Sequence, residues 1–148
     1  KTDLKGIITY ANKDFIEISG FSETELVGQS HNIVRHPDMP VEAFADLWKT
    51  VKNGTSWNGI VKNRCKNGDY YWISANVTPV REQGKAVGYM SVRTRPTREQ
   101  VEAAEGLYRL FKEGKADEEK RYQVLVKPGH HADDATMLSD YVYVAHVR

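Results

Sequence analysis

The feature that most constrains the fold is a long run of strand-like sequence interrupted only by tight turns. Residues 57–63, 69–80 and 86–95 are rich in β-branched and aromatic side chains and indicate three strands. Asn67-Gly68, a dipeptide typical of two-residue hairpin turns, joins the first pair, and residues 82–85 join the second. Because connections this short link antiparallel neighbours, the sequence predicts an antiparallel meander at the centre of the fold.

Helical patterns precede and follow this meander. Residues 41–51 place apolar side chains three or four positions apart along much of their length, which indicates an amphipathic helix. Two short helices are expected before it, over residues 11–20 and 22–27, and a last helix over 97–112. A strand at residues 7–10 precedes them all. One strand, short helices, three strands and a closing helix predict an α+β fold with room for a pocket between sheet and helices.

Length, charge and cysteine content exclude several classes of function. At 148 residues the chain is the size of one domain, and its net charge of +1 lacks the positive field of a general nucleic-acid binder. No stretch is long and apolar enough to span a membrane, and the single cysteine, Cys65, cannot form a disulfide within the chain. We therefore expect a cytoplasmic module without nucleic-acid or membrane contact. Since the chain opens on Lys1 rather than Met, we expect it to be a piece of a longer protein.

Two segments together resemble the PAS domains, a family of sensory modules. Residues 3–28 read Asp-Leu-x-Gly-x-Ile-x-Tyr-x-Asn-x-x-Phe-x-x-x-Ser-Gly-Phe-x-x-x-Glu-Leu-x-Gly, and residues 59–92 contain the Asn-Gly hairpin and Trp72. The resemblance covers residues 3–95. It implies the PAS fold, in which a five-stranded antiparallel sheet and short helices enclose a cofactor cleft.

The interval before the long predicted helix narrows the resemblance. Residues 31–40 read His-Asn-Ile-Val-Arg-His-Pro-Asp-Met-Pro, and Phe-Ala-Asp-Leu-Trp follows at 44–48. This interval is similar to the flavin-binding PAS module of bacterial aerotaxis and redox receptors, where the cofactor is noncovalent FAD and its redox state is the signal. The resemblance implies that this chain binds FAD, is not an enzyme, and signals to a downstream chemotaxis-type domain of the same receptor. It also implies a homodimer and an inner-membrane anchor in the full-length receptor.

The resemblance divides the chain into three parts. Residues 1–96 correspond to the PAS sensor domain, residues 97–113 to a C-terminal signalling helix, and residues 114–148 to an unassigned tail. The first strand of a PAS sheet normally lies before the Asp3–Gly6 turn, and almost none of it is present. Either preceding residues supply it or another strand replaces it, and residues 141–146 are one candidate.

Arg35, His36 and Asp38 lie in a polar loop that is stiffened by a proline. Arg35 offers fixed donors to a phosphate or carbonyl group, His36 titrates near neutral pH, and Asp38 can orient either of them. On residue types alone, an exposed loop with a weak surface Arg–Asp pair is the commoner alternative. The resemblance implies instead that these three side chains bind FAD.

Phe44, Trp48 and Trp57 are candidate walls around a flat aromatic ligand. Phe44 and Trp48 are four residues apart and share one helical face, where an aromatic stripe more often belongs to the core. Trp57 opens the first strand of the meander, close to Gly59, and is the better pocket candidate. In the resembled receptors these positions are linked to flavin binding.

Asn12, Asn63 and Arg93 complete the predicted set of cofactor-binding residues. Asn63 alternates in phase with Val61, so it points inward, where an unpaired amide costs on the order of 1–3 kcal/mol and can bond the polar edge of a flavin. Asn12 either caps the first short helix or reaches the cofactor. Arg93 either faces outward or places a cation near the flavin, where it would stabilise the reduced, anionic form.

Other functions remain open at this point. They are a cofactor-free or small-metabolite-binding PAS module acting as a dimerisation surface, a haem-based gas sensor using His31 or His36, and an enzyme that uses flavin catalytically. Cys65 lies near a hairpin rather than where photoadduct-forming flavin domains place their cysteine, so we expect no light-driven adduct. We expect no metal site, because the histidines and aspartates of residues 130–134 more often form a solvated loop.

Overall fold

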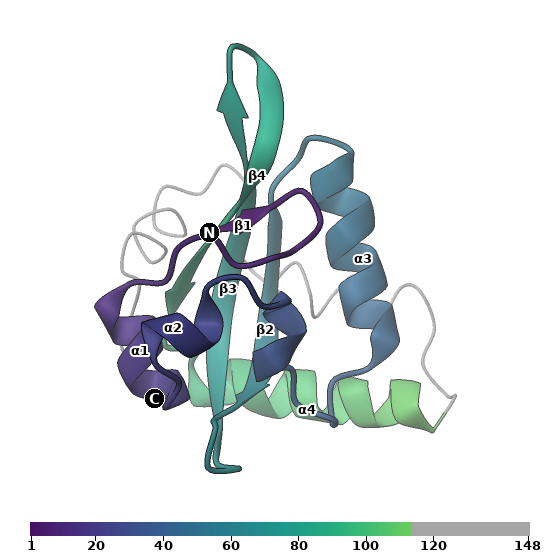
Figure 1. The fold of residues 1–148 in the computed structure, drawn as a ribbon. Coiled ribbons are helices and arrows are strands. Elements are labelled where there is room, and N and C mark those ends of the chain that lie inside the picture. The colour runs from purple at the N-terminus through teal and green to yellow at the C-terminus, as the bar shows by residue number, and fades with distance from the viewer. Residues whose placement is uncertain (114–148) are drawn as a thin grey trace.

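The computed structural model describes residues 1–113, which form a curved antiparallel sheet with helices on both faces (Figure 1). Within these residues the sheet contains four strands in the spatial order β1-β4-β3-β2. They are β1 (Thr2–Asp3), β2 (Trp57–Arg64), β3 (Tyr70–Glu82) and β4 (Lys85–Thr94). The pairing of β2 with β3 runs from Trp57↔Val77 to Arg64↔Tyr70, and β3 pairs with β4. The predicted meander is therefore confirmed, with β2 at one edge of the sheet.

The structure confirms the predicted turn at residues 82–85 but not the one at Asn67-Gly68. Gln83 and Gly84 alone connect β3 to β4, and their φ angles of 51° and 78° suit a tight two-residue turn. The Asn67-Gly68 connection instead spans residues 65–69, so the prediction of a two-residue turn there is wrong. The Asn67 side chain accepts the Asp69 backbone N–H at 2.9 Å, and this local bond stabilises the wider loop.

Among the described residues, four helices lie where the sequence predicts them, and a further 3-10 helix was not predicted. They are α1 (Lys13–Ser19), α2 (Glu23–Leu26), the 3-10 helix η1 (His31–Val34), α3 (Val41–Lys52) and α4 (Arg98–Lys112). Asn12 caps α1, because its side-chain oxygen accepts the Phe15 backbone N–H at 3.0 Å. Thr97 and Gln100 form a capping box at the start of α4.

Residues 7–10 form no strand, contrary to the prediction. Within residues 1–113, this segment takes part in isolated bridges alone, such as that of Ile8 to Thr2. The Ile8 backbone N–H donates to the Gln29 carbonyl at 2.9 Å, so the segment pairs with a neighbouring loop instead of extending the sheet. The described sheet therefore has four strands where the resemblance implied five. The suggested replacement strand at 141–146 lies outside the described residues.

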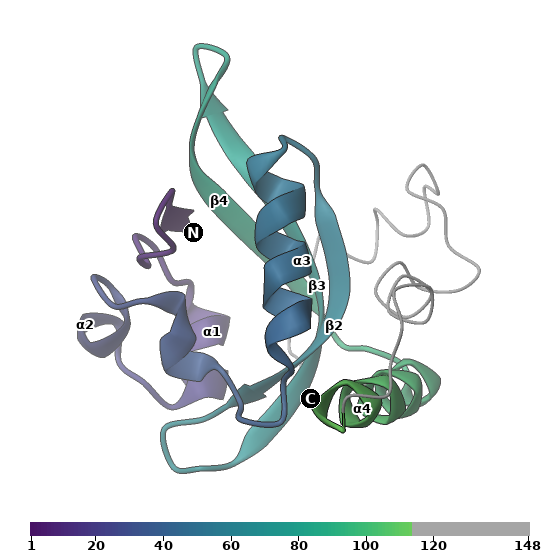
Figure 2. The same ribbon diagram turned by 90° about the vertical axis from the view of Figure 1, so that its right-hand side faces the viewer.

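The two faces of the sheet carry different helices. Figure 2 shows α1, α2 and α3 on one face and α4 on the other. The Tyr108 hydroxyl of α4 donates to the Ile60 carbonyl of β2. The Lys62 backbone N–H of the same strand donates to the Met39 sulfur at 3.3 Å. These contacts occupy two backbone groups on the outer edge of β2.

Candidate functional site

A cavity of about 410 Å³ lies between the sheet and the side that carries α1, η1 and α3. Alternate strand residues form its floor, because successive side chains of a strand point to opposite faces. The cavity has the size of a small-molecule pocket and a largely apolar lining. Its floor includes Trp57, Val61, Asn63, Ile73, Ala75, Val77, Tyr89, Ser91 and Arg93. The structure thus contains the expected cleft between sheet and helices.

The polar end of the cavity, as we name it, is formed by Asn63 and Arg93, which are 1% and 8% exposed. Among the described residues, Asn63 Nδ2, Arg93 Nη1 and the nearby Tyr71 hydroxyl form no hydrogen bond of good geometry, although Asn63 and Arg93 lie close enough to Tyr71 to lower the pKa of its hydroxyl. Burial raises the pKa of Tyr71, although the Arg93 cation opposes the rise, so the phenol stays neutral. Because a buried donor without a partner costs about 1–3 kcal/mol, these groups mark a place suited to a polar ligand.

His31 holds the Arg93 guanidinium at the polar end. Arg93 Nη2 lies 2.7 Å from His31 Nε2, and the neutral imidazole accepts this hydrogen bond. Burial, and then the Arg93 charge, lower the pKa of His31 to about 3, so the ring is uncharged at neutral pH. Arg93 Nε also donates to Ser91 Oγ at 3.2 Å. No carboxylate is found among the described residues that line the cavity, so Arg93 brings a positive charge without a counter-ion.

Aromatic side chains of α3 form a second part of the wall. Trp48 packs edge-on against Tyr89 of β4, with 5.6 Å between the ring centroids. Phe44 lies one turn earlier, and the Arg35 guanidinium stacks 4.1 Å from the centre of its ring. Both α3 side chains also pack against the hydrophobic core. Phe44 and Trp48 are therefore both part of the core packing and part of the cavity wall.

Trp57 forms a third part of the wall at the start of β2. Its side chain is 3% exposed, and its indole Nε1 donates to Asp46 Oδ2 of α3 at 2.9 Å. The indole has therefore satisfied its only polar group within the protein, and it presents an apolar ring to the cavity.

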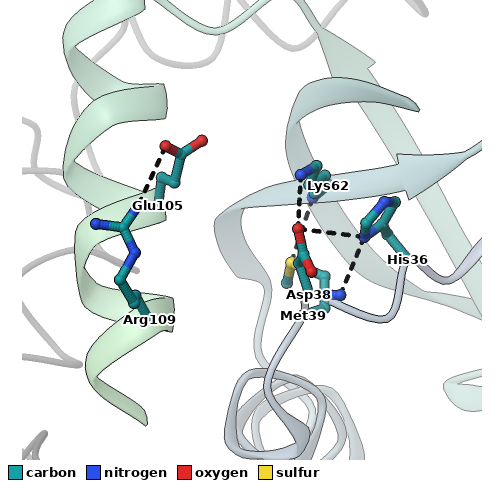
Figure 3. Close-up of polar contacts among 6 residues, drawn as sticks. All are labelled: His36, Asp38, Met39, Lys62, Glu105 and Arg109. Atoms are coloured by element: carbon teal, nitrogen blue, oxygen red, sulfur yellow. Dashed lines mark hydrogen bonds and ion pairs between the residues drawn. The ribbon is translucent and has the colours of Figure 1, made fainter. Parts of the chain in front are cut away.

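The Arg35–Asp38 loop lies outside the described cavity lining. The Asp38 carboxylate binds Lys62, with 2.8 Å between Oδ2 and Nζ, and its side chain is 67% exposed (Figure 3). His36 Nδ1 accepts the Asp38 backbone N–H at 3.0 Å. Burial, and then the Lys62 charge, lower the pKa of His36, and the Lys62 hydrogen bond lowers the pKa of Asp38. The loop is thus held against β2 by partners of its own.

Six of the nine residues that the sequence suggested line the cavity, and three do not. Those on the wall are Asn12, Phe44, Trp48, Trp57, Asn63 and Arg93, and those outside it are Arg35, His36 and Asp38. Asn12 also caps α1, so its two interpretations are compatible. Arg93 is buried at the cavity and does not face outward. The part that each residue plays in binding a cofactor stays a prediction.

The sequence did not reveal three residues that position this site. Tyr71 alternates in phase with the inward-facing Ile73, and this alternation could have identified it. Lys62 alternates with Asn63 along β2, which predicts that it lies on the opposite face of the sheet, but nothing in the sequence indicates its ion pair with Asp38. Asp46 is one of several charged residues on an amphipathic helix, so nothing in its spacing pointed to Trp57.

The remaining candidate residues lie away from the cavity. Cys65 Sγ donates to the Ile18 carbonyl at 3.1 Å and is not part of the described lining. Within residues 1–113, no group of three or more His, Cys, Asp and Glu is placed to hold a metal ion. Across the same residues, no helix has both the length and the apolar character needed to cross a membrane. The His130–Asp134 segment lies outside the described residues.

Comparison with known proteins identifies relatives for most of the chain. The family described as PAS fold matches residues 8–93. The aerotaxis receptor of Escherichia coli K12 is 51% identical over 128 residues, which are 86% of this chain and 25% of the receptor. Because only 113 residues precede the tail, this alignment extends into it. The nitrogen fixation regulatory protein of Klebsiella pneumoniae is 29% identical over 93 residues, 62% of this chain and 19% of that protein. The chain thus spans a quarter or less of these relatives.

Solved structures share the fold. The PAS domain of a protein from Colwellia psychrerythraea has a TM-score of 0.59 and 26% identity, over 66% of this chain and 83% of that one. A light-oxygen-voltage domain studied with a flavin analogue has a TM-score of 0.60 over 74% of this chain and 79% of that one. Its identity is 20%, so this likeness concerns the fold alone. The family match covers more than half of the sequence and agrees with the architecture. This chain belongs to the PAS family.

Proposed function

We propose that this PAS domain binds FAD noncovalently in the cavity and reports the redox state of the cofactor to a downstream signalling domain. The observation that carries the proposal is a pair of buried donors, Asn63 Nδ2 and Arg93 Nη1, that have no partner among residues 1–113 and lie on the wall of an aromatic cavity. In this proposal no substrate is turned over, because the signal is a change in the hydrogen bonds that Asn63 and Arg93 make to the flavin. The relatives named as an aerotaxis receptor and a regulatory protein support a sensory role.

The residues of the cavity fit a flavin ring. The ring is flat and aromatic, and its polar edge carries oxygen and nitrogen atoms that accept hydrogen bonds. Trp48 and Trp57 offer apolar surfaces for its faces, while Asn63 and Arg93 offer donors for that edge. The light-oxygen-voltage domain studied with a flavin analogue gives a precedent for a flavin in this fold.

The charges around the cavity support an anionic ligand. Lys1, Lys5 and Arg93 line it, and the described lining contains neither Asp nor Glu. Arg35 stacks on Phe44, which is part of the wall, and in this proposal its guanidinium reaches the part of FAD that extends from the cavity. There its fork of donors suits a pyrophosphate. We favour FAD over FMN because of this arginine, the long polar loop and the family resemblance. On this view His36 and Asp38 position the loop that carries Arg35.

A bound flavin supplies reversible two-electron chemistry, and its reduced form gains a proton and often a negative charge. Arg93 favours the negatively charged form, because its guanidinium is buried and lacks a counter-ion in the described lining. His31 and Ser91 hold that guanidinium in place, so it is already oriented when the charge develops. The Asn63 amide can present either its nitrogen or its oxygen to the ligand. A difference of ~1–3 kcal/mol between the two states is enough for a useful signal.

The route from the cavity to a partner runs through β2 and α4 in this proposal. Asn63 faces the cavity, while the Ile60 carbonyl of the same strand accepts the Tyr108 hydroxyl of α4. Burial raises the pKa of Tyr108, so the hydroxyl remains a donor. We therefore assign residues 1–96 to the sensor and 97–113 to the signalling helix. By resemblance, we place the sensor in the cytoplasm, within a homodimeric receptor that is anchored to the inner membrane.

The haem alternative has less support in the described residues. Arg93 already binds Nε2 of His31, a nitrogen that would have to bind iron. His36 lies outside the cavity lining, and its Nδ1 accepts the Asp38 backbone N–H. A Soret band in the purified protein would reverse this ranking.

The proposal is tested by loading the protein with FAD and reducing it without oxygen. We expect one FAD per chain, loss of the flavin absorbance on reduction and its recovery in air. We also expect amide hydrogen exchange in α4 to differ between the two states. A protein that takes up no FAD would contradict flavin binding, and identical exchange in both states would contradict signalling through α4. Sustained NADH oxidation by the loaded protein would favour an enzyme instead.

A further inference from the structure

We propose that Asp46 is a positioning residue of the cavity: it fixes the Trp57 indole as a flat wall against which the planar part of FAD packs. This inference rests on the proposed function and extends it to a residue of α3 that is not itself part of the described lining. Three observations carry it: a hydrogen bond, a close approach to a glycine, and the burial of the ring.

The hydrogen bond joins two elements across the cavity wall. Trp57 Nε1 of β2 donates to Asp46 Oδ2 of α3 at 2.9 Å, and the indole side chain is 3% exposed. Because an indole has one polar hydrogen, this bond satisfies all of its polar capacity. The carboxylate thereby fixes one edge of the ring. A charge-assisted bond of this kind is stronger than a neutral one.

The other edge of the ring lies over Gly59. A Cβ built on Gly59 would lie 2.2 Å from Trp57 Cη2 and 2.5 Å from Cζ2, closer than any real side chain permits. Residues 57 and 59 are two apart on a strand, so their side chains would point to the same face. The indole therefore lies flat along β2 because Gly59 has no side chain to lift it.

Together these contacts decide what the wall can offer a ligand. With its N–H bound to Asp46 and its six-membered ring on Gly59, Trp57 presents only an apolar aromatic surface. That surface suits the face of a planar ring and offers nothing to a polar group. Without Asp46, the buried indole N–H would lack its hydrogen-bond acceptor. The Trp57 side chain would then no longer be held in its present rotamer and could turn into the cavity. A rotated ring would occupy volume that the ligand needs.

The experiment compares FAD affinity in four variants and the wild type by fluorescence titration. We expect Asp46→Ala to weaken FAD binding about tenfold, since a buried donor loses its acceptor. Asp46→Asn keeps an acceptor oxygen and should remain within about twofold of the wild type. Gly59→Ala should weaken FAD binding as much as Asp46→Ala, because the added methyl group would push the Trp57 indole away from the strand. Glu42→Ala, which removes an acidic side chain from the same helix outside the lining, is the matched control and should bind as the wild type does.

Two readouts separate positioning from general destabilisation. Hydrogen exchange of the Trp57 indole N–H should accelerate in Asp46→Ala without FAD, and the visible circular dichroism of bound FAD should change. An Asp46→Ala variant with wild-type affinity and wild-type indole exchange would overturn the inference. So would equal loss of affinity in Asp46→Ala and Glu42→Ala. If the wild type itself binds no FAD, the proposed function fails, and unchanged indole exchange in Asp46→Ala would then overturn this inference separately.

Discussion

The polar end of the cavity and the Arg35–Asp38 loop contain similar side chains, but these side chains are satisfied in different ways. In the cavity, Asn63 and Arg93 are buried, and each leaves one donor without a partner among the described residues. In the loop, the Asp38 carboxylate binds Lys62, and its backbone N–H binds the imidazole two residues before it. His36 and Asp38 of the loop thus have partners within the chain, whereas two donors of the cavity have none among the described residues.

This difference separates polar groups that hold the fold from polar groups that await a ligand. A partnered group stabilises the protein, so its removal should lower the free energy of unfolding. A buried group without a partner opposes folding, so its replacement by an apolar side chain should leave stability unchanged or raise it. For the affinity for FAD we expect the reverse: removal of an unpartnered group of the cavity should lower it strongly, and removal of a partnered group of the loop should lower it little. Four predictions follow from this contrast.

The largest effect is expected at Arg93. Arg93→Met should lower FAD affinity about a hundredfold, because it removes a charged donor whose hydrogen bond contributes roughly 1.5–3 kcal/mol. The melting temperature of the FAD-free protein should change little, since removal of a buried charge without a counter-ion in the described lining offsets the loss of the hydrogen bonds to His31 and Ser91. Titration with FAD and thermal unfolding measure the two quantities. Arg81→Met, on an exposed part of β3, is the control. Unchanged affinity in Arg93→Met would contradict the role of the polar end.

Two asparagines of β2 allow a matched comparison of its two faces. Asn63→Leu should lower FAD affinity about tenfold with no loss of stability, because its Nδ2 has no partner among the described residues. Asn58 accepts a hydrogen bond from Asn76 at 2.8 Å on the other face. Asn58→Leu should therefore lower the free energy of unfolding by about 1 kcal/mol and leave affinity unchanged. If Asn63→Leu and Asn58→Leu both lowered only FAD affinity, or both lowered only the free energy of unfolding, the proposed difference between the two faces of β2 would be wrong.

The two histidines should differ in how they couple stability to pH. The folded-state pKa of His31 is about 3, below its ordinary value, so between pH 6.5 and pH 3 the unfolded chain binds a proton that the folded chain does not. Stability should fall as pH falls through this range, by up to about 1.4 kcal/mol per pH unit from this group. His31→Gln should remove that slope when unfolding by urea is followed from pH 7 to pH 5.

His36 provides the control for that slope. Its pKa is also lowered by burial, but the Asp38 carboxylate opposes the shift. We expect His36→Gln to change the pH dependence less than His31→Gln does. A larger change in His36→Gln would mean that the loop, rather than the cavity, holds the more strongly perturbed histidine.

The smallest effect is expected at the loop. Lys62→Met removes the partner of Asp38, whose side chain is 67% exposed. We expect a loss of about 0.5–1 kcal/mol of stability and about a threefold loss of FAD affinity, through the loop that carries Arg35. Lys66→Met, which breaks the more distant pair with Glu25, is the matched control and should leave affinity unchanged. A tenfold or greater loss in Lys62→Met would show that the loop acts on the cofactor as strongly as the cavity does.

Features set by local sequence were predictable in this protein. Asn12 and Thr97 cap helices because their side chains reach backbone groups three residues away, and the sequence predicted a helix at each of these places. The inward direction of Asn63 followed from the period of two along its strand. The meander followed from the order of the strand and turn signals, and the family from the resemblance of residues 3–28 and 59–92 to PAS domains.

Features set by contacts between distant segments were not predictable in the same way. Residue types alone did not show that Asp38 would bind Lys62 of β2, since that pairing depends on where η1 and α3 lie against the sheet. Nothing near Asp46 in sequence indicated Trp57, and only the packing of α3 on β2 brings them together. The strand expected at residues 7–10 had suitable side chains, but its backbone pairs with the loop at Gln29.

The central claim is that a flavin satisfies the two buried donors of the cavity, and co-elution of FAD with the protein tests it most directly. The wild type and the Arg93→Met/Asn63→Leu double variant would be mixed with excess FAD and passed through gel filtration. We predict one FAD per wild-type chain and less than about a tenth of that in the double variant, whose melting temperature should differ little from that of the wild type. A wild type that carries no FAD, or a double variant that retains it fully, would contradict the claim.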